Sequence, residues 1–208
     1  MSERTTARPV RRQARGERRI ATLLDAAAEV FAESGYEAAT TNAIAARADA
    51  SPGTLYQFFP NKEAIAAALA ERYVGQLQAI YDVAFAPDVA RLPLATLIDR
   101  VLDPLVSFNV ANPGFAALLA GPTTPEHLAA AAQRLHTAVL ERMDALLASF
   151  TPNLPAARRQ RCGQVSVQLV KAFMPTIRAV DGAERDALVT ELKKVLQGYL
   201  GPLADPTP

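Results

Sequence analysis

The chain has 208 residues, enough to bury a sizeable core, and a net charge of only +1. Half of its residues are hydrophobic, and alternating β-branched runs are scarce, so the composition favours helices. No segment reaches the roughly 18 uninterrupted apolar residues that a membrane-spanning helix needs, and nothing at the N-terminus resembles a signal peptide. The single cysteine, Cys162, cannot form an intramolecular disulfide, which fits the reducing cytoplasm. Together these features lead us to expect an all-α, cytoplasmic protein with no membrane segment.

The N-terminal segment is strongly basic. Residues 1–19 contain seven arginines against two glutamates and few apolar side chains. This composition predicts a flexible arm that is disordered alone. Nucleic-acid phosphates can bind such an arm, because binding releases the counterions condensed on them. A solvated tail without a partner is the alternative.

The next segment predicts a helix that ends at a glycine. Apolar residues recur with helical spacing from Ile20 to Phe31, so one face of this helix packs inward. Gly35 follows, and a glycine suits the left-handed position after a helix end.

Two short helices are predicted next. The first covers residues 41–48, with Thr40 capping its free amides. The second runs from Pro52 to about Phe59, because Ser51 supplies a capping hydroxyl and proline is well tolerated at the first helical position.

The rest of the chain predicts six more helices, nine in total. A long fourth helix starts after Asn61, and a loop between Pro87 and Pro93 separates it from the fifth. The motif Thr124-Pro125-Glu126 predicts a capped helix start, and Gly201-Pro202 predicts that the ordered part of the chain ends there. The fifth helix is predicted from the helical period of residues 94–105, which continues through Pro104, and the other predicted ranges are about 62–85, 113–120, 124–151, 155–180 and 183–200.

The two short helices have the dimensions of a helix-turn-helix, whose second helix can enter the major groove of DNA. Hydrogen-bond donors and a cation gather around them, as contacts to phosphates and base edges require. These residues are Thr40, Thr41, Asn42, Ser51, Thr54, Tyr56, Gln57 and Lys62.

The residues that carry a family resemblance are Gly35-Tyr36, Thr40, Ile44-Ala45, Ala48, Ser51, Gly53-Thr54-Leu55-Tyr56, Phe59 and Lys62. Their order and spacing over about residues 15–75 resemble the TetR family of bacterial regulators. The turn departs from that family's common Ala-Gly-Val-Ser, because Asp49 and Ala50 stand at its second and third positions. Aspartate tolerates a left-handed backbone better than most residues, so we expect the turn to form.

The resemblance implies a role for each DNA-binding candidate. Thr40 and Thr41 start the positioning helix against a phosphate, and Tyr56 and Lys62 bind backbone phosphates. Gln57 adds a further contact, since its side-chain amide could pair with an adenine in the major groove, and Asn42 is a similar candidate. The residues implied to approach base edges are Pro52, Gly53 and Thr54.

The resemblance also implies how the whole protein works. Its domains would be a basic arm (1–19), a DNA-binding domain (20–62) and a ligand-sensing and dimerisation domain (63–204). The last two helices pair with a second copy, so that a dimer binds a palindromic double-stranded DNA operator. A small-molecule ligand in the C-terminal domain releases this repressor. The residues nominated to line its pocket are Phe108, Phe115, Leu118, Met143, Lys171 and Met174.

Other interpretations stay open for several residues. His127 and His136 fall on opposite sides of one predicted helix, so a shared metal ion is not expected, and no cofactor is expected either. Lys171 lies on one stripe with Gln164 and Gln168, and a buried lysine would need a carboxylate partner, a route to water, or the acidic end of a ligand.

Two other classes of protein are the alternatives to a regulator of this kind. A helical enzyme is disfavoured because no nucleophile pair, glycine-rich phosphate loop or metal-ligand spacing is found. A DNA-binding protein without a ligand would have a solid C-terminal core and an affinity indifferent to sequence.

Overall fold

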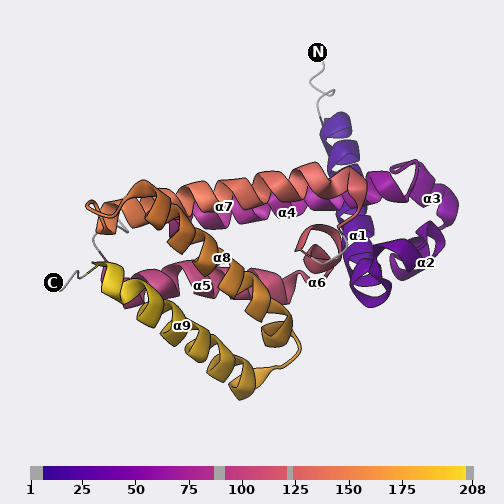
Figure 1. Ribbon diagram of the computed structural model, residues 1–208. Coiled ribbons are helices and arrows are strands. Elements are labelled where there is room, and N and C mark those ends of the chain that lie inside the picture. The colour runs from indigo at the N-terminus through magenta and orange to yellow at the C-terminus, as the bar shows by residue number, and fades with distance from the viewer. Residues whose placement is uncertain (1–6, 87–91, 121–123, 205–208) are drawn as a thin grey trace, which may run out of the picture. The chain divides into compact units, whose positions relative to one another are not determined.

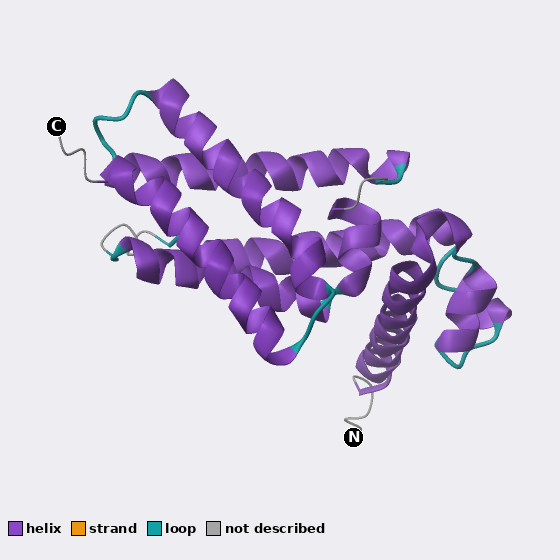
Figure 2. Ribbon diagram, turned by 60° about the horizontal axis from the view of Figure 1, so that its bottom comes forward, coloured by secondary structure: helices purple, strands orange, loops and turns teal. Residues whose placement is uncertain are grey.

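The computed structural model describes residues 7–86, 92–120 and 124–204, which form two compact units. The first unit contains the described residues up to Arg72 together with Pro113–Ala129, and the second contains Tyr73–Asn112 and the described residues from Ala130 onward. Every regular element within these ranges is a helix (Figure 2), so the predicted all-α fold class is confirmed, as are nine α-helices in the described chain.

The first unit begins with a helix longer than predicted. Helix α1 starts at Ala7, so residues 7–19, predicted as a disordered arm, are helical. Arginine, alanine and glutamate all favour helices, and Pro9 lies in the first turn, where amides need no helical acceptor. The elements of this unit are α1 (Ala7–Ala38), α2 (Thr41–Arg47), α3 (Pro52–Tyr56), the start of α4 (Lys62–Ala84), α6 (Pro113–Phe115), the π-helical turn η2 (Ala116–Ala120) and the 3₁₀ turn η3 (Glu126–Leu128).

The core of the first unit joins α1 to the two short helices (Figure 1). Phe31 of α1, Ile44 of α2 and Leu55 of α3 are all fully buried. Helix α6 and the turn η2 pack on α1, so Pro113–Ala129 forms part of this unit although the sequence analysis placed it in the C-terminal domain. The cap of this segment also differs from the prediction, because Pro125 rather than Thr124 precedes the helical turn and no side chain caps it.

The second unit is a bundle of long helices. Helices α5, α8 and α9 pack side by side (Figure 1). Arg142 of α7 reaches the part of α4 that belongs to this unit, where it forms an ion pair with Asp82 at 3.0 Å. The helices of this unit are the remainder of α4, α5 (Leu94–Ala111), α7 (Ala129–Phe150, from its second residue), α8 (Ala156–Arg178) and α9 (Gly182–Ala204).

A continuous apolar core holds α5, α8 and α9 together. Leu102, Ile177 and Leu192 contribute one side chain from each helix, and all three are almost completely buried. Lys193 of α9 adds an ion pair to α5, with its Nζ 2.6 Å from a carboxylate oxygen of Asp103. The apolar periodicity of these helices is therefore used for packing within one chain.

The end of α9 contradicts the sequence prediction. Gly201 and Pro202, predicted to end order, lie inside the helix, which continues to Ala204. Pro202 has no amide hydrogen to donate to the carbonyl of Gly198, but the helix continues past it for two residues. None of the described helices is long and apolar enough to cross a membrane.

Candidate DNA-binding surface

Side-chain caps start both short helices. Thr40 Oγ1 accepts a hydrogen bond from the amide of Ala43 at 3.1 Å, and Ser51 Oγ accepts one from the amide of Thr54 at 3.1 Å. Each hydroxyl satisfies an amide that would otherwise lack a helical partner. Both caps were predicted from the sequence, and both are confirmed.

The turns before and between these helices need unusual backbone angles. Gly35, at φ 74° and ψ 166°, breaks the helical geometry near the end of α1, in a conformation that is essentially restricted to glycine. Asp49 adopts φ 47° in the turn between α2 and α3. The left-handed backbone expected of this aspartate is therefore present.

Helix α3 has a buried side and an exposed side. Leu55 is fully buried and Phe59, just beyond the helix, is 7% exposed, so these two anchor it. Pro52, Gly53 and Gln57 are exposed. A duplex can thus approach the outer side of α3 without moving any core residue.

The backbone at Gly53 is open to an approaching molecule. A Cβ built there would meet only Ser51 Oγ, at 3.8 Å, so the surface above this glycine is open. Thr54 beside it is half-buried, and its hydroxyl lies 2.9 Å from Ser51 Oγ. Both hydroxyls can still take a second hydrogen bond from outside.

The hydroxyl of Tyr56 connects the two helices. It lies 3.0 Å from Thr41 Oγ1, and the tyrosine side chain is 51% exposed. Asn42, beside Thr41 at the start of α2, is also exposed. The start of α2 and the end of α3 therefore present polar groups close together.

Lys62 is engaged within the protein. Its Nζ donates to the carbonyl oxygens of Tyr36 at 2.8 Å and Glu37 at 3.0 Å, and lies 4.4 Å from the centre of the Tyr36 ring. The ammonium group has three donors, so one remains for a phosphate. Lys62 thus satisfies carbonyls at the end of α1, a role in addition to the phosphate contact predicted from the sequence.

Tyr36 is the centre of this contact. Its hydroxyl donates to Glu63 Oε1 at 3.5 Å, and its ring packs against His127, with 5.4 Å between ring centroids. Burial, followed by the charges of Glu63 and Glu37, raises the pKa of Tyr36 to about 12. Tyr36 therefore stays neutral at physiological pH and links α1, α4 and η3 within the first unit.

Arg47 fixes α2 against α1 from the outside. Its guanidinium lies 2.9 Å from Glu29 and 2.7 Å from Glu33. The hydrogen bonds to Glu33 and Glu29 raise the pKa of Arg47, and the bond to Arg47 lowers the pKa of Glu33. Sequence reasoning missed this role, because the two acids precede Arg47 by 18 and 14 positions.

Comparison with known proteins agrees with this geometry. Residues 23–69 match the family described as "Bacterial regulatory proteins, tetR family", and residues 93–200 match that described as "Tetracyclin repressor-like, C-terminal domain". The chain belongs to the TetR family. It is therefore a DNA-binding transcriptional regulator.

A curated relative matches a short part of the regulator. A fatty acid metabolism regulator protein of Bacillus subtilis (strain 168) is 43% identical over 54 residues, which is 26% of this chain and 28% of that protein. The chain thus spans little more than a quarter of the length of this curated relative.

Solved structures match over nearly the whole regulator. A TetR-like regulator from Rhodococcus sp. RHA1 has a TM-score of 0.73 at 22% identity, covering 88% of this chain and 96% of that one. The regulator FadR from Bacillus subtilis, solved in complex with stearoyl-CoA, has a TM-score of 0.60 at 20% identity, covering 84% and 96%. At these identities the likeness concerns the fold.

The residues nominated for a ligand pocket of the regulator divide between the two units. Phe115 and Leu118 belong to the first unit, where Leu118 is fully buried. In the second unit, Phe108 packs edge-on against Tyr73, with 6.1 Å between ring centroids. Leu118 and Phe108 are thus both buried, each within its own unit.

The other three nominated residues all belong to the second unit. Met174 lies in the core shared by α5, α8 and α9, and Met143 packs against Gly163 of α8. Lys171 is exposed, as are Gln164 and Gln168, so the polar stripe of α8 faces outward. A buried lysine that needs a partner, one of the predicted alternatives, is therefore not found.

Proposed function

We propose that the exposed side of α3 enters the major groove of an operator and that α2 positions it. The observation that carries this proposal is the division of α3 into a buried inner side, anchored by Leu55, and an outer side of small and polar groups. A recognition helix needs this division, since it must be held firmly and still leave donors free for base edges.

In this proposal, base edges and phosphates are contacted by different residues. Gln57 and Thr54 would form hydrogen bonds with base edges, and Pro52 and Gly53 would allow the close approach. The residues assigned to phosphates are Thr40, Thr41, Ser51, Tyr56 and the remaining donor of Lys62, with Asn42 beside them.

We further propose a homodimer formed through α8 and α9. Val165 of α8 is 42% exposed and Val195 of α9 is 44% exposed, which leaves apolar side chains on the outside of both helices. A twofold dimer would present two recognition helices about one helical turn of DNA apart, so its operator would be palindromic.

Repression relieved by a small molecule completes the proposal. A ligand that binds the second unit better when the two recognition helices of the dimer stand at a spacing that does not fit DNA shifts the population away from the DNA-binding state. A relative of the same fold was solved with stearoyl-CoA, which makes acyl-CoA thioesters the first effectors to test. This relief would make the regulator responsive to a metabolite.

A mobility-shift assay on the DNA that flanks the regulator's own gene tests this function. We expect a complex with a specific fragment that resists competitor DNA and dissociates when an effector is added. Acyl-CoA thioesters form one series and extracted metabolites a second. Equal affinity for specific and random fragments would contradict an operator function. A specific complex that no effector dissociates would contradict only the proposed control by a ligand and would leave the operator function intact.

A further inference from the structure

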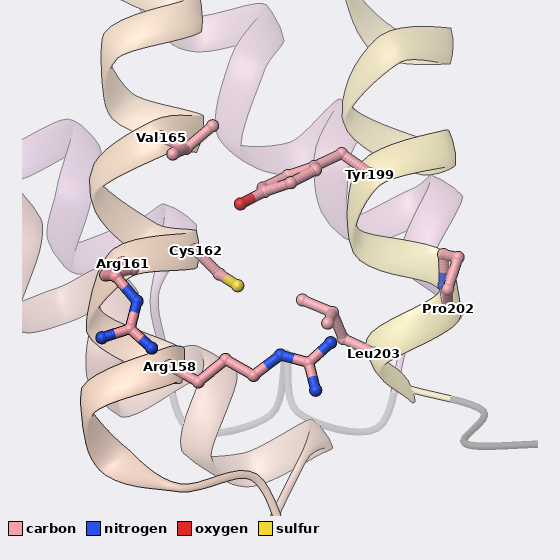
Figure 3. A pocket seen from close by; sticks show the side chains of 7 residues that line it. All are labelled: Arg158, Arg161, Cys162, Val165, Tyr199, Pro202 and Leu203. Carbon is pink, nitrogen blue, oxygen red and sulfur yellow. The ribbon is translucent and has the colours of Figure 1, made fainter.

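A hollow lies in the second unit between the start of α8 and the last turns of α9 (Figure 3). Arg158 extends across it toward Leu203, and Arg161 lies one helical turn further along α8. Neither guanidinium has an ion pair or a side-chain hydrogen bond with the described residues. Two exposed cations therefore stand at this end of the α8/α9 pair without a carboxylate. The other side chains that line the hollow are Cys162, Val165, Tyr199 and Pro202.

The outer side of α8 carries no other charge. At about 100° per residue, the stripe that begins with Arg158 and Arg161 continues through Val165, Ala172 and Thr176. All five residues are exposed. Small and apolar side chains therefore follow the two cations along the outside of this helix, and they leave room for another helix to approach.

The outer side of α9 carries acids at its opposite end. Glu184, Glu191, Val195 and Pro202 are exposed and lie within about 40° of one another around the helix. Glu191 pairs with Lys194 on the same helix at 2.7 Å. Glu184, in the first turn, has no ion pair or side-chain hydrogen bond within the described part of the chain, and neither has the exposed side chain of Asp181 just before the helix.

Two contacts fix how the ends of the helices align. At the start of α9, Arg185 Nε donates to the carbonyl oxygen of Ile177 near the end of α8, at 3.3 Å. At the other end, Tyr199 of α9 forms a hydrogen bond with Cys162 of α8. The outer face of the pair is therefore cationic where α8 starts and acidic where α9 starts, with Val165 and Val195 between.

We propose that a second copy of the chain covers this face with its helices reversed, so that Arg158 and Arg161 lie against the partner's Asp181 and Glu184. The hollow would then receive the acidic end of the partner's α8/α9 pair. Guanidinium groups bind carboxylates through paired, charge-assisted hydrogen bonds. This inference rests on the proposed homodimer and adds the direction of the partner and the residues that set it.

The charges decide between two ways of pairing the same face. A twofold axis that crosses the helices places the cationic end of each copy against the acidic end of the other, and it forms this contact twice. A twofold axis along the helices would instead gather the arginines of both copies at one end and the acids at the other. Like charges brought together at an interface weaken it, so the first arrangement is favoured.

Charge reversal at each end tests this direction in the intact protein. Sedimentation velocity measures the dissociation constant of the dimer. We expect Arg158→Glu/Arg161→Glu and Asp181→Arg/Glu184→Arg each to weaken the dimer about tenfold or more, because both contacts then join like charges. An equal mixture of the two variants should recover a dimer close to wild type in affinity, and native mass spectrometry should find one copy of each variant in it.

Single reversals have charge-matched controls on the same helices. Lys171→Glu is compared with Arg158→Glu, and Asp186→Arg is compared with Glu184→Arg. Lys171 and Asp186 are exposed but lie on other sides of α8 and α9, so their reversal should leave the dimer unchanged. Circular dichroism establishes that each variant keeps its fold.

The outcomes separate this inference from the homodimer itself. A wild-type dimer that neither double reversal weakens, or variants that do not recover on mixing, would overturn the direction of pairing and leave the homodimer standing. If Arg158→Glu/Arg161→Glu binds the wild type more tightly than the wild type binds itself, like ends meet and the inference is wrong. A monomeric wild type would contradict both proposals. None of these results depends on DNA binding.

Discussion

The cap of the recognition helix gives a prediction that separates stability from DNA contact. Ser51 Oγ accepts the amide hydrogen of Thr54 at 3.1 Å, and Ser51→Ala leaves this amide without a partner in the protein. Loss of an N-cap of this kind costs about 1 kcal/mol. In a protein of about 150–250 residues that unfolds in one transition, this loss lowers Tm by about 2–4 °C.

Three further substitutions assign the effect to its cause. Ser51→Asn keeps a capping oxygen, so Tm should stay close to that of the wild type. Thr54→Val removes the hydroxyl of Thr54 but keeps its amide, so the cap should survive while base contacts change. Ser51→Asp also caps the helix but places a negative charge where a phosphate is proposed to bind, so Tm should hold while operator affinity falls.

Thermal denaturation followed by circular dichroism measures the stability, and a fluorescence anisotropy titration with operator DNA measures the affinity. The capping argument fails if Ser51→Ala melts at the wild-type temperature. The phosphate assignment fails if Ser51→Asp binds the operator as tightly as Ser51→Asn does.

Three other predictions concern assembly, packing and ionisation. Val195→Asp should keep the fold, since this side chain is 44% exposed, but should give a monomer in light scattering; an intact dimer would contradict the proposed interface. Gly163→Ala should lower Tm, because its Cβ would lie 3.1 Å from Met143 Cγ and overpacking costs about 1–3 kcal/mol against a gain in helix propensity of about 1 kcal/mol. Gly75→Ala, which meets nothing within 4 Å, should raise Tm, and equal gains from both would refute the packing argument. Because the folded-state pKa of Tyr36 is raised to about 12, wild-type stability should fall relative to Tyr36→Phe as pH rises from about 10 toward 12 in urea titrations, and parallel curves would contradict this.

Local features of the DNA-binding surface could be predicted because neighbouring residues determine them. Thr40, Ser51 and Asn61 each cap the helix that follows within three residues. The left-handed backbone of Asp49 also follows from its place in a tight turn. Such features need no knowledge of tertiary contacts.

Contacts between distant segments could not be predicted in the same way. Lys62 donates to the carbonyl oxygens of Tyr36 and Glu37, which precede it by 26 and 25 positions, so its role depends on how α1 and α4 meet. The ring contact between Tyr36 and His127 depends on η3 joining the first unit. Neither arrangement leaves a periodic pattern in the sequence.

Helical periodicity also leaves the direction of each face undetermined. In α8, the stripe that contains Lys171 faces outward, because Met174 and Ile177 on another side of the helix fill the core. Nothing in the sequence pattern singles out Arg158 and Arg161, and only the position of α9 reveals the hollow that they line together with Tyr199. A pocket formed by two helices thus requires the structure.

Base preference measures most directly whether the outer side of α3 reads DNA. Binding of wild type, Gln57→Ala and Thr54→Val to a library of randomised operator sites would be compared by sequencing the bound fraction. Each variant should lose discrimination at one or two base pairs in each half-site and keep the wild-type preference elsewhere, at a cost of about 1–3 kcal/mol per lost base contact. Identical preferences in all three proteins would contradict the assignment of α3 as the recognition helix.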